Sequence, residues 1–182
     1  MKQTLEINNP LIERCKQGDI KAQFLLYKQY STSMYNIAIR FLNNKMDAED
    51  ILQESFITAF NKLVDLKSDA SFGTWLKRIV INNCISFLRK NKIYFEDVDD
   101  FPAEEMAASQ EIEKSASPAL IHNAIKELPE GARTVLVLHS LEGYKHREIS
   151  EMLSISESTC RTQYKRALGL LNSKLKNKIY VN

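Results

Sequence analysis

The sequence between residues 148 and 168 constrains the fold of this chain more than any other segment. Ile149 and Leu153 lie four residues apart, so a short helix here presents a single apolar face. Apolar residues then recur at helical spacing over the segment that follows. These patterns predict a short helix over residues 146–153 and a longer one over residues 157–175, joined by a tight turn. Such an arrangement is a helix-turn-helix.

The predicted turn contains two residues that suit it, and two other residues of the motif depart from the usual pattern. Ile155 is the apolar plug that this kind of turn needs between its helices. Ser156 is a residue type that caps the first turn of a helix. Ser154 stands where glycine is usual, so we expect it to adopt a left-handed conformation at a modest energetic cost. Ser150, in the first helix, stands where alanine is usual.

The second helix of the motif is amphipathic on a wheel of about 100° per residue. Its predicted buried face comprises Cys160, Tyr164, Ala167, Leu168, Leu171 and Leu175. Its predicted outward face carries the hydroxyl and cationic side chains Ser158, Arg161, Thr162, Lys165 and Arg166. Arg and Lys donate to guanine in the major groove, and Thr contacts a thymine methyl group or a phosphate. This face therefore predicts binding to duplex DNA, and an ordinary solvated basic face is the alternative.

The first half of the chain carries three further stretches of helical periodicity. Apolar residues recur at helical spacing over residues 27–42, 51–63 and 72–88. A break at Asn43–Lys45 separates the first two stretches, and Asp47 is the residue that we expect to cap the second. With only 5 Gly and 4 Pro in the whole chain, helices are favoured over strands and turns. A compact helical domain is therefore predicted here.

Between the two helical parts, the composition changes sharply. Residues 91–117 hold 8 acidic and 2 basic side chains, with Pro102 near the middle, whereas the parts on either side are each net basic. This composition predicts a flexible acidic linker, and the alternative is an acidic segment that mimics nucleic acid and occupies a basic channel. The predicted fold class is all-α, with two small helical domains over residues 10–92 and 118–178 joined by a linker over residues 93–117.

Several classes of function find no support in the residues. The 3 cysteines lack the spacing of a disulfide framework or a metal motif, so a reducing compartment fits them. His122, His139 and His146 share no helical face with further ligands, so no metal is predicted. No phosphate-binding loop, nucleophile elbow or carboxylate pair points to an enzyme, a cofactor or a small-molecule substrate. No signal core or membrane span is evident, so we expect a cytoplasmic protein.

The motifs of both helical parts resemble one known family. The stretch Asp47–Phe60 closely resembles conserved region 2.2 of bacterial sigma factors, and Phe72–Lys90 resembles the regions that follow it. The helix-turn-helix block resembles region 4 of the same proteins. The blocks occur in the right order, and regions 1.1 and 3 are absent, which is typical of the small extracytoplasmic-function (ECF) group. The chain thus resembles an ECF sigma factor.

The resemblance implies which partners the chain binds. In that family the helix of region 2.2 binds the coiled coil of the β′ subunit of core RNA polymerase, and the β subunit and promoter DNA are further partners. On this resemblance we assign Asp50, Gln53, Glu54 and Phe56 to the polymerase surface. Helix capping alone explains Asp50, but it does not explain Gln53 or Glu54. The family also implies an anti-sigma factor that holds both domains inactive.

The resemblance further implies that the first domain opens and reads the minus-ten promoter element, and that region 4 reads the minus-thirty-five element. The predicted DNA-binding residues of the first domain are Phe72, Lys77, Arg78, Asn82 and Arg89. The last three are spaced by four and seven residues and form a polar stripe suited to phosphates and an exposed base. A loop at about residues 66–73 is the expected pocket for a flipped base. For Phe72 and Trp75, core packing is the alternative.

Two other functions remain open on the residues alone. A conventional regulator with an N-terminal sensing or dimerisation domain would bind a palindrome by itself, although no ligand-pocket signature supports it. A helical adaptor that binds only protein would tolerate the replacement of Arg161 and Lys165 by Ala. A sigma factor would instead lose polymerase affinity when Gln53 and Glu54 are replaced.

Overall fold

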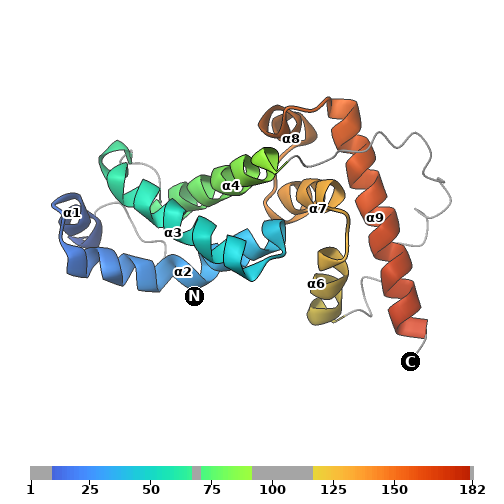
Figure 1. Cartoon of the computed structure of the whole chain (residues 1–182), viewed down its shortest axis with the longest axis horizontal. Helices are drawn as coiled ribbons and strands as arrows, with labels where there is room; N and C mark the ends of the chain where they lie inside the picture. The colour runs from blue at the N-terminus through green and yellow to red at the C-terminus, as the bar shows by residue number, and fades with distance from the viewer. Residues whose placement is uncertain (1–9, 67–70, 92–116, 181–182) are drawn as a thin grey trace. The chain divides into compact units, whose positions relative to one another are not determined.

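The computed structural model describes residues 10–66, 71–91 and 117–180. Every regular element within these ranges is helical, which confirms the all-α prediction (Figure 1). The chain divides between Leu88 and Arg89 into two compact units, called here the N-terminal and C-terminal units. Apart from its last residue, the predicted linker 93–117 lies outside the described residues, so its flexibility and the exact domain bounds stay predictions. No helix within the described ranges is long and apolar enough to cross a membrane.

The N-terminal unit is built on a helical hairpin. Its described elements are α1 (Pro10–Lys16), α2 (Ile20–Leu42), α3 (Lys45–Asn61), the 3₁₀ turn η1 (Leu63–Asp65) and α4 (Phe72–Lys90). Helices α2 and α3 lie side by side, and α1 packs against α2 (Figure 1). The largest fully buried side chains of the unit are Phe41, Phe72, Ile12, Leu26, Leu63, Leu76, Ile81 and Leu88. The three predicted apolar stretches therefore fall on α2, α3 and α4, whereas α1 was not predicted.

Helix α2 begins at a cap that is reinforced by an ion pair. The carboxylate of Asp19 accepts hydrogen bonds from the backbone N–H groups of Lys21 at 2.9 Å and Ala22 at 3.2 Å. Arg14 of α1 donates to the same carboxylate, with Nε and Oδ2 2.8 Å apart. The Arg14 hydrogen bond, followed by the one from Ala22, lowers the pKa of Asp19. This contact fixes the short turn between α1 and α2.

The start of α3 differs from the sequence-based expectation. Asn43 closes α2 in a left-handed conformation with φ of 52°, and α3 begins two residues later. The cap of α3 is Asn44, whose side-chain oxygen accepts from the N–H of Met46 at 2.9 Å. The prediction that Asp47 caps this helix is therefore wrong. Asp47 lies in the first turn instead, where the positive end of the helix dipole favours an acidic side chain.

Helix α4 is held against α2 and α3 by an aromatic and a polar contact. The rings of Tyr30 and Phe72 meet edge to face with centroids 5.2 Å apart. Gly73 follows directly, and a Cβ at this position would lie only 2.8 Å from Cε1 of Tyr30, so the close approach requires glycine. Further along α4, Nδ2 of Asn83 donates to Oγ of the buried Ser55 at 3.0 Å.

The C-terminal unit is arranged around one long helix. Its described elements are α6 (Pro118–Lys126), α7 (Glu130–Leu136), the π-turn η3 (Val137–Leu141), α8 (His146–Leu153) and α9 (Glu157–Tyr180). Helices α6, α7 and α8 all pack along α9 (Figure 1). The buried apolar side chains of this unit are Ala124, Ile125, Leu128, Ala132, Val135, Leu136, Val137, Leu138, Ile149, Leu153, Cys160, Ala167 and Leu175.

A buried arginine stabilises the junction between α6 and α7. Arg133 is only 6% exposed, and its Nη1 donates to the carbonyl oxygens of Leu128 at 3.0 Å and Lys126 at 3.3 Å. These carbonyls lie at and just beyond the end of α6, where no intrahelical donor remains for them. Arg133 thus supplies the donors that the end of the helix lacks.

The turn between α8 and α9 confirms the predicted helix-turn-helix. Ser154 is left-handed with φ of 56°, as expected for a residue at a position that glycine usually occupies. The N–H of Ile155 donates to the carbonyl of Ser150 at 3.0 Å, and the Ile155 side chain is half-buried. Oγ of Ser156 accepts from the N–H of Thr159 at 2.9 Å, which is the predicted cap of the second helix.

Candidate nucleic-acid surfaces and the α2–α3 groove

The outward face of α9 carries the five predicted DNA-binding side chains of the C-terminal unit. Three of them, Ser158, Arg161 and Lys165, are exposed, and the other two, Thr162 and Arg166, are half-buried. Arg161 is paired along the helix with Glu157, with Nη2 and Oε1 2.5 Å apart. Exposed pairs of this kind contribute little to stability, so the guanidinium can exchange its partner for a phosphate or a base.

The inward face of α9 agrees only in part with the helical wheel. Cys160, Ala167 and Leu175 are buried, as predicted, whereas Tyr164, Leu168 and Leu171 are half-buried. Two polar residues that the wheel did not assign to the core, Gln163 and Asn172, are also buried, at 1% and 7% exposure. Because α6, α7 and α8 surround α9 on several sides, its buried surface is wider than the apolar stripe alone indicates.

On α4, the predicted polar stripe faces solvent. Arg78, Asn82 and Arg89 are exposed, and Lys77 is half-buried. Phe72 does not lie on the surface as predicted. Its side chain is only 1% exposed because its ring packs between Tyr30 and Trp75. The predicted contact of Phe72 with DNA is therefore replaced by core packing.

A hollow of about 300 Å³ lies beside this stripe, between the end of α3, η1 and the middle of α4. Its lining side chains are Thr58, Lys62, Asp65, Trp75, Ile79, Asn82 and Asn83. An aromatic ring, amide groups and a cation in one hollow match the groups that bind a single unstacked base. Half of the predicted loop pocket at residues 66–73, residues 67–70, falls outside the described residues, so the hollow is a neighbouring feature that the sequence did not reveal.

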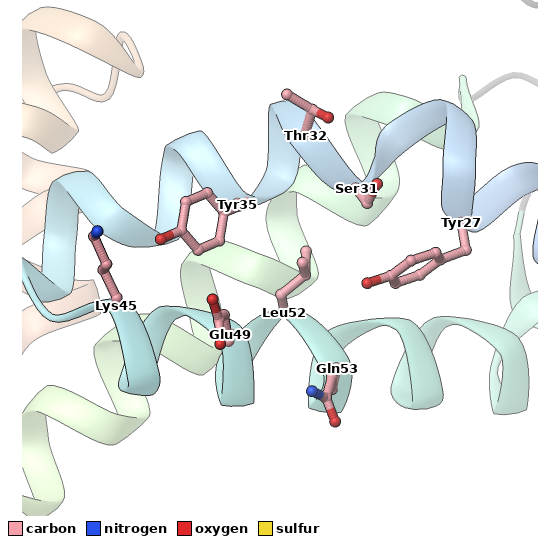
Figure 2. Close-up of a pocket in the computed structure, with 8 residues that line it drawn as sticks. All are labelled: Tyr27, Ser31, Thr32, Tyr35, Lys45, Glu49, Leu52 and Gln53. Carbon is pink, nitrogen blue, oxygen red and sulfur yellow. The ribbon is translucent and has the colours of Figure 1, made fainter.

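A second hollow, of about 560 Å³, runs between α2 and α3. It is lined by Tyr27, Ser31, Thr32, Tyr35, Lys45, Glu49, Leu52 and Gln53 (Figure 2). Figure 2 shows Tyr27 and Tyr35 of α2 pointing toward α3, and Glu49 and Leu52 of α3 pointing back toward α2. We refer to this hollow as the α2–α3 groove. Sequence periodicity did not predict it, because the groove depends on which residues of the two helices lie opposite each other.

The residues predicted to bind polymerase lie on α3, at and beside this groove. Asp50, Gln53 and Glu54 are exposed, and Gln53 lies on the groove rim with its side chain directed away from α2 (Figure 2). Phe56 does not lie on the surface as predicted. Its side chain is 3% exposed and packs against Tyr27, with ring centroids 4.8 Å apart. Phe56 therefore supports the surface from within and does not form part of it.

Large apolar side chains continue the outer surface of the hairpin past Tyr27. On α2, Ile20 is 79% and Phe24 is 61% exposed, four residues apart on one helical face. On the paired segment, Ile57 of α3 is 62% and Val64 of η1 is 71% exposed. Several large apolar side chains exposed on neighbouring segments are typical of surfaces that another macromolecule covers.

Metal-ligating side chains do not gather anywhere in the described ranges in groups of three or more that would hold an ion. His139 and His146, for which the sequence indicated no shared site, lie together in the C-terminal unit with stacked rings. Cys15, Cys84 and Cys160 are buried free thiols, and burial raises their pKa values to about 11, 12 and 11.

Two family models match the chain, one in each unit. The model of sigma-70 region 2 matches residues 26–93, and the model of sigma-70 region 4 matches residues 119–171. The first contains the α2–α3 groove and the α4 stripe, and the second contains the helix-turn-helix.

Curated relatives match over nearly the whole chain. The RNA polymerase sigma-H factor of Pseudomonas aeruginosa is 30% identical and covers 94% of this chain and 95% of its own length. The ECF RNA polymerase sigma-E factor of Haemophilus influenzae is 29% identical, with coverage of 91% and 93%.

Two solved structures share the fold. One is the sigma factor RpoE in complex with the anti-sigma factor NepR from Bartonella quintana, with a TM-score of 0.52, 19% identity, and coverage of 86% of this chain and 98% of that one. The other is CnrH in complex with the cytosolic domain of CnrY, with a TM-score of 0.50, 21% identity, and coverage of 97% and 99%.

Proposed function

This chain belongs to the sigma-70 family of RNA polymerase sigma factors, as an ECF-type member with regions 2 and 4, and from that premise we propose which partner each of its two units binds. As a sigma factor, the chain directs RNA polymerase to promoters and is not an enzyme. The N-terminal unit binds core polymerase and reads the minus-ten element. The C-terminal unit reads the minus-thirty-five element through α9. Family membership sets aside the interpretations as a conventional regulator or a protein-only adaptor.

The polymerase surface is assigned to the exposed side of α3. Gln53 and Glu54 lie three and four residues after Asp50, so both are neighbours of Asp50 on the helix surface and the three form one polar row. Helix capping does not account for Gln53 and Glu54, which lie in the middle of α3. The adjoining groove and the exposed Ile57 add concave and apolar surface beside this row. A polar row beside apolar contact area is the usual composition of a protein interface. The β′ subunit is the partner assigned to this row, and the β subunit completes the core enzyme.

The minus-ten element is assigned to α4 and to the hollow beside it. Arg78 and Arg89 supply cations for the DNA backbone, and Lys77 adds a third on the same helix. Asn82 is exposed and also lines the hollow, where Trp75 offers an aromatic face. Hydrogen bonds from the amide and stacking on the ring together suit a base that has left the duplex.

The minus-thirty-five element is assigned to the outward face of α9. A second helix of a helix-turn-helix enters the major groove, and the residues near its start reach the base edges. Arg161 and Lys165 are the exposed cations of that face, with Ser158, Thr162 and Arg166 beside them. The observation that carries the whole proposal is that one chain holds this motif together with the exposed row on α3.

We further propose an anti-sigma factor as a regulatory partner and the cytoplasm as the location. The structurally similar RpoE was solved with an anti-sigma factor, and the exposed apolar residues Ile20 and Phe24 provide surface that a protein partner would cover. The cytoplasmic location follows from the proposed function, because core polymerase and promoter DNA are both in the cytoplasm.

The assignment of α3 is tested with purified core polymerase and the full chain. The double variant Gln53→Ala with Glu54→Ala is compared with the wild type in core binding and in transcription from a promoter mapped after overexpression. Replacement of two residues at an interface centre costs about 1–2 kcal/mol or more each, so core affinity should fall at least about tenfold. The control is Gln29→Ala, which removes an exposed glutamine on α2. Unchanged core affinity in the double variant would refute the assignment.

A further inference from the structure

Four side chains and one backbone carbonyl meet where η3, α8 and α9 join. The imidazole rings of His139 on η3 and His146 on α8 are stacked, with centroids 4.2 Å apart and planes inclined by 16°. The ring of Tyr164 on α9 meets both edge to face, at 4.6 Å from His139 and 5.3 Å from His146. Cys160 approaches from the same helix as Tyr164, and the carbonyl of Tyr144 approaches from the turn before α8. The histidine pair thus connects α9 to the two elements beside it.

The neighbours of the two rings constrain which ring nitrogens carry protons. Nδ1 of His139 lies 2.8 Å from the carbonyl oxygen of Tyr144, and a carbonyl only accepts, so this nitrogen donates. Nδ1 of His146 lies 3.6 Å from Sγ of Cys160. Burial raises the pKa of Cys160 to about 11, so the group is a protonated thiol that donates weakly to Nδ1 of His146. A proton added to that nitrogen removes the acceptor and turns a second donor toward the thiol, whose sulfur accepts only weakly.

The surroundings of His146 also oppose a positive charge. His146 is the first residue of α8, at the positive end of the helix dipole. Arg161 of α9 adds another cation, and the nearby Glu157 is already engaged by Arg161. Burial, then the stacked His139, then Arg161 lower the pKa of His146, while Glu157 alone raises it. Neutral His146 is therefore the form that the packing accommodates.

We propose that the stacked pair His139–His146 positions α9 on α8 while His146 is neutral, and that protonation of His146 loosens this packing and weakens duplex binding. The part concerning DNA rests on the proposed reading of the minus-thirty-five element by α9. Folding lowers the pKa of His146, so the folded protein binds a proton less readily than the unfolded chain does. The contribution of neutral His146 to the free energy of unfolding is complete above the ordinary imidazole pKa of about 6.5. It is lost as the pH falls through the pKa of His146 in the folded protein.

Amide hydrogen exchange of the full chain at about pH 7.5 and about pH 5.5, corrected for the pH dependence of intrinsic exchange, tests the packing directly. Protection in α8 and in the first two turns of α9 should fall at the lower pH by up to about tenfold, because pH 5.5 lies about one unit below the ordinary imidazole pKa of the unfolded chain. Protection in α3 should change little and serves as the internal reference. A fall of equal size in α3 would overturn the proposal, because it would reflect the general effect of acid.

Two variants separate the pair from other histidines. His146→Gln has no ionisable ring, so protection of α8 and α9 should no longer respond to pH in this window. His122→Gln, on α6 and outside the cluster, should keep the wild-type response. If His146→Gln does not fold, NMR titration of the histidine ring protons in the wild type decides: the pKa of His146 should lie below the ordinary imidazole value of about 6.5. A pKa of His146 at or above that value would overturn the proposal.

The polymerase complex on a mapped promoter then connects packing to DNA. Wild-type affinity should decline more steeply between about pH 7.5 and about pH 5.5 than that of the His146→Gln complex. Equal slopes, with α8 and α9 loosening as expected, would leave the positioning role of the pair in place and overturn only its link to DNA. A complex whose promoter affinity does not depend on α9 at either pH would contradict the proposed function, and the hydrogen-exchange result would be unaffected.

Discussion

Asn83 of α4 and Ser55 of α3 are joined by a hydrogen bond in which Nδ2 of Asn83 donates to Oγ of Ser55 at 3.0 Å. The same hydroxyl donates to the carbonyl of Ile51 at 2.6 Å, so its proton is already committed and its lone pair is presented to the amide. Ser55 is fully buried, with 0% exposure. This contact connects the helix assigned to polymerase with the helix assigned to the minus-ten element.

Replacement of Ser55 by Ala should therefore destabilise the N-terminal unit. The amide of Asn83 loses its acceptor in a partly buried site, which costs about 1–3 kcal/mol. Urea unfolding followed by circular dichroism measures the loss. Ser33→Ala is the control, because Ser33 also donates to a backbone carbonyl on its own helix but is exposed. A loss for Ser55→Ala no larger than that for Ser33→Ala would contradict the importance of the contact.

Gly73→Ala should destabilise the packing of α4 on α2. An added Cβ lies 2.8 Å from Cε1 of Tyr30, and the ring cannot withdraw freely because it packs against Phe72. Overpacking of this kind costs about 1–3 kcal/mol. The measurement is a thermal or urea unfolding curve of the full chain.

A double-mutant cycle identifies the cause of that loss. Combining Gly73→Ala with Tyr30→Leu should cost less than the sum of the two single losses, because the shorter side chain makes room for the methyl group. Strict additivity would show that the two residues do not clash.

Arg133→Met should destabilise the C-terminal unit by about 2–4 kcal/mol. Methionine fills a similar volume but donates no hydrogen bond, so the carbonyls of Lys126 and Leu128 lose the donor that Arg133 supplies. The exposed Arg147→Met on α8 is the matched control and should change stability by less than about 0.5 kcal/mol. Equal losses for the two variants would show that burial of the guanidinium does not matter.

Lys165→Ala should weaken promoter binding by the polymerase complex and reduce the slope of log affinity against log salt by about one. The reason is the loss of one cation from the outward face of α9. Affinities are measured by fluorescence anisotropy on a promoter fragment at several salt concentrations.

Lys174→Ala is the control for this experiment. Lys174 lies on the same helix, half-buried and paired with Glu127 at 3.1 Å, on the side that packs toward α6. The salt slope should stay at the wild-type value in this variant. If both variants lowered the slope equally, the effect would come from net charge and not from the outward face.

The sequence determined the helices, apart from α1 and the exact start of α3, because helical periodicity and capping are local. The tight turn after Leu153, the cap at Ser156 and the left-handed Ser154 depend on residues within one or two turns of each other, and all three were predictable. For the same reason, helical spacing alone is enough to place Asp50, Gln53 and Glu54 on one side of a helix, and all three are exposed there.

Tertiary structure decided which side chains remain on a surface. Phe56 and Phe72 belong to motifs that indicated binding, yet both are buried because Tyr27 and Tyr30, far away in sequence, supply aromatic partners. Gln163 is buried because three other helices surround α9. A helical wheel describes one helix and contains no information about its neighbours.

The sites that join distant segments follow the same rule. The α2–α3 groove exists only once the hairpin sets Tyr35 opposite Glu49, and the stacked pair His139–His146 exists only once η3 and α8 meet beside α9. The sequence by itself therefore determined the family and every described helix except α1, because periodicity and motif order are local properties of the sequence. Only the tertiary structure decided the groove, the hollow beside Asn82 and the histidine stack, because each requires side chains from separate helices to be brought within contact distance.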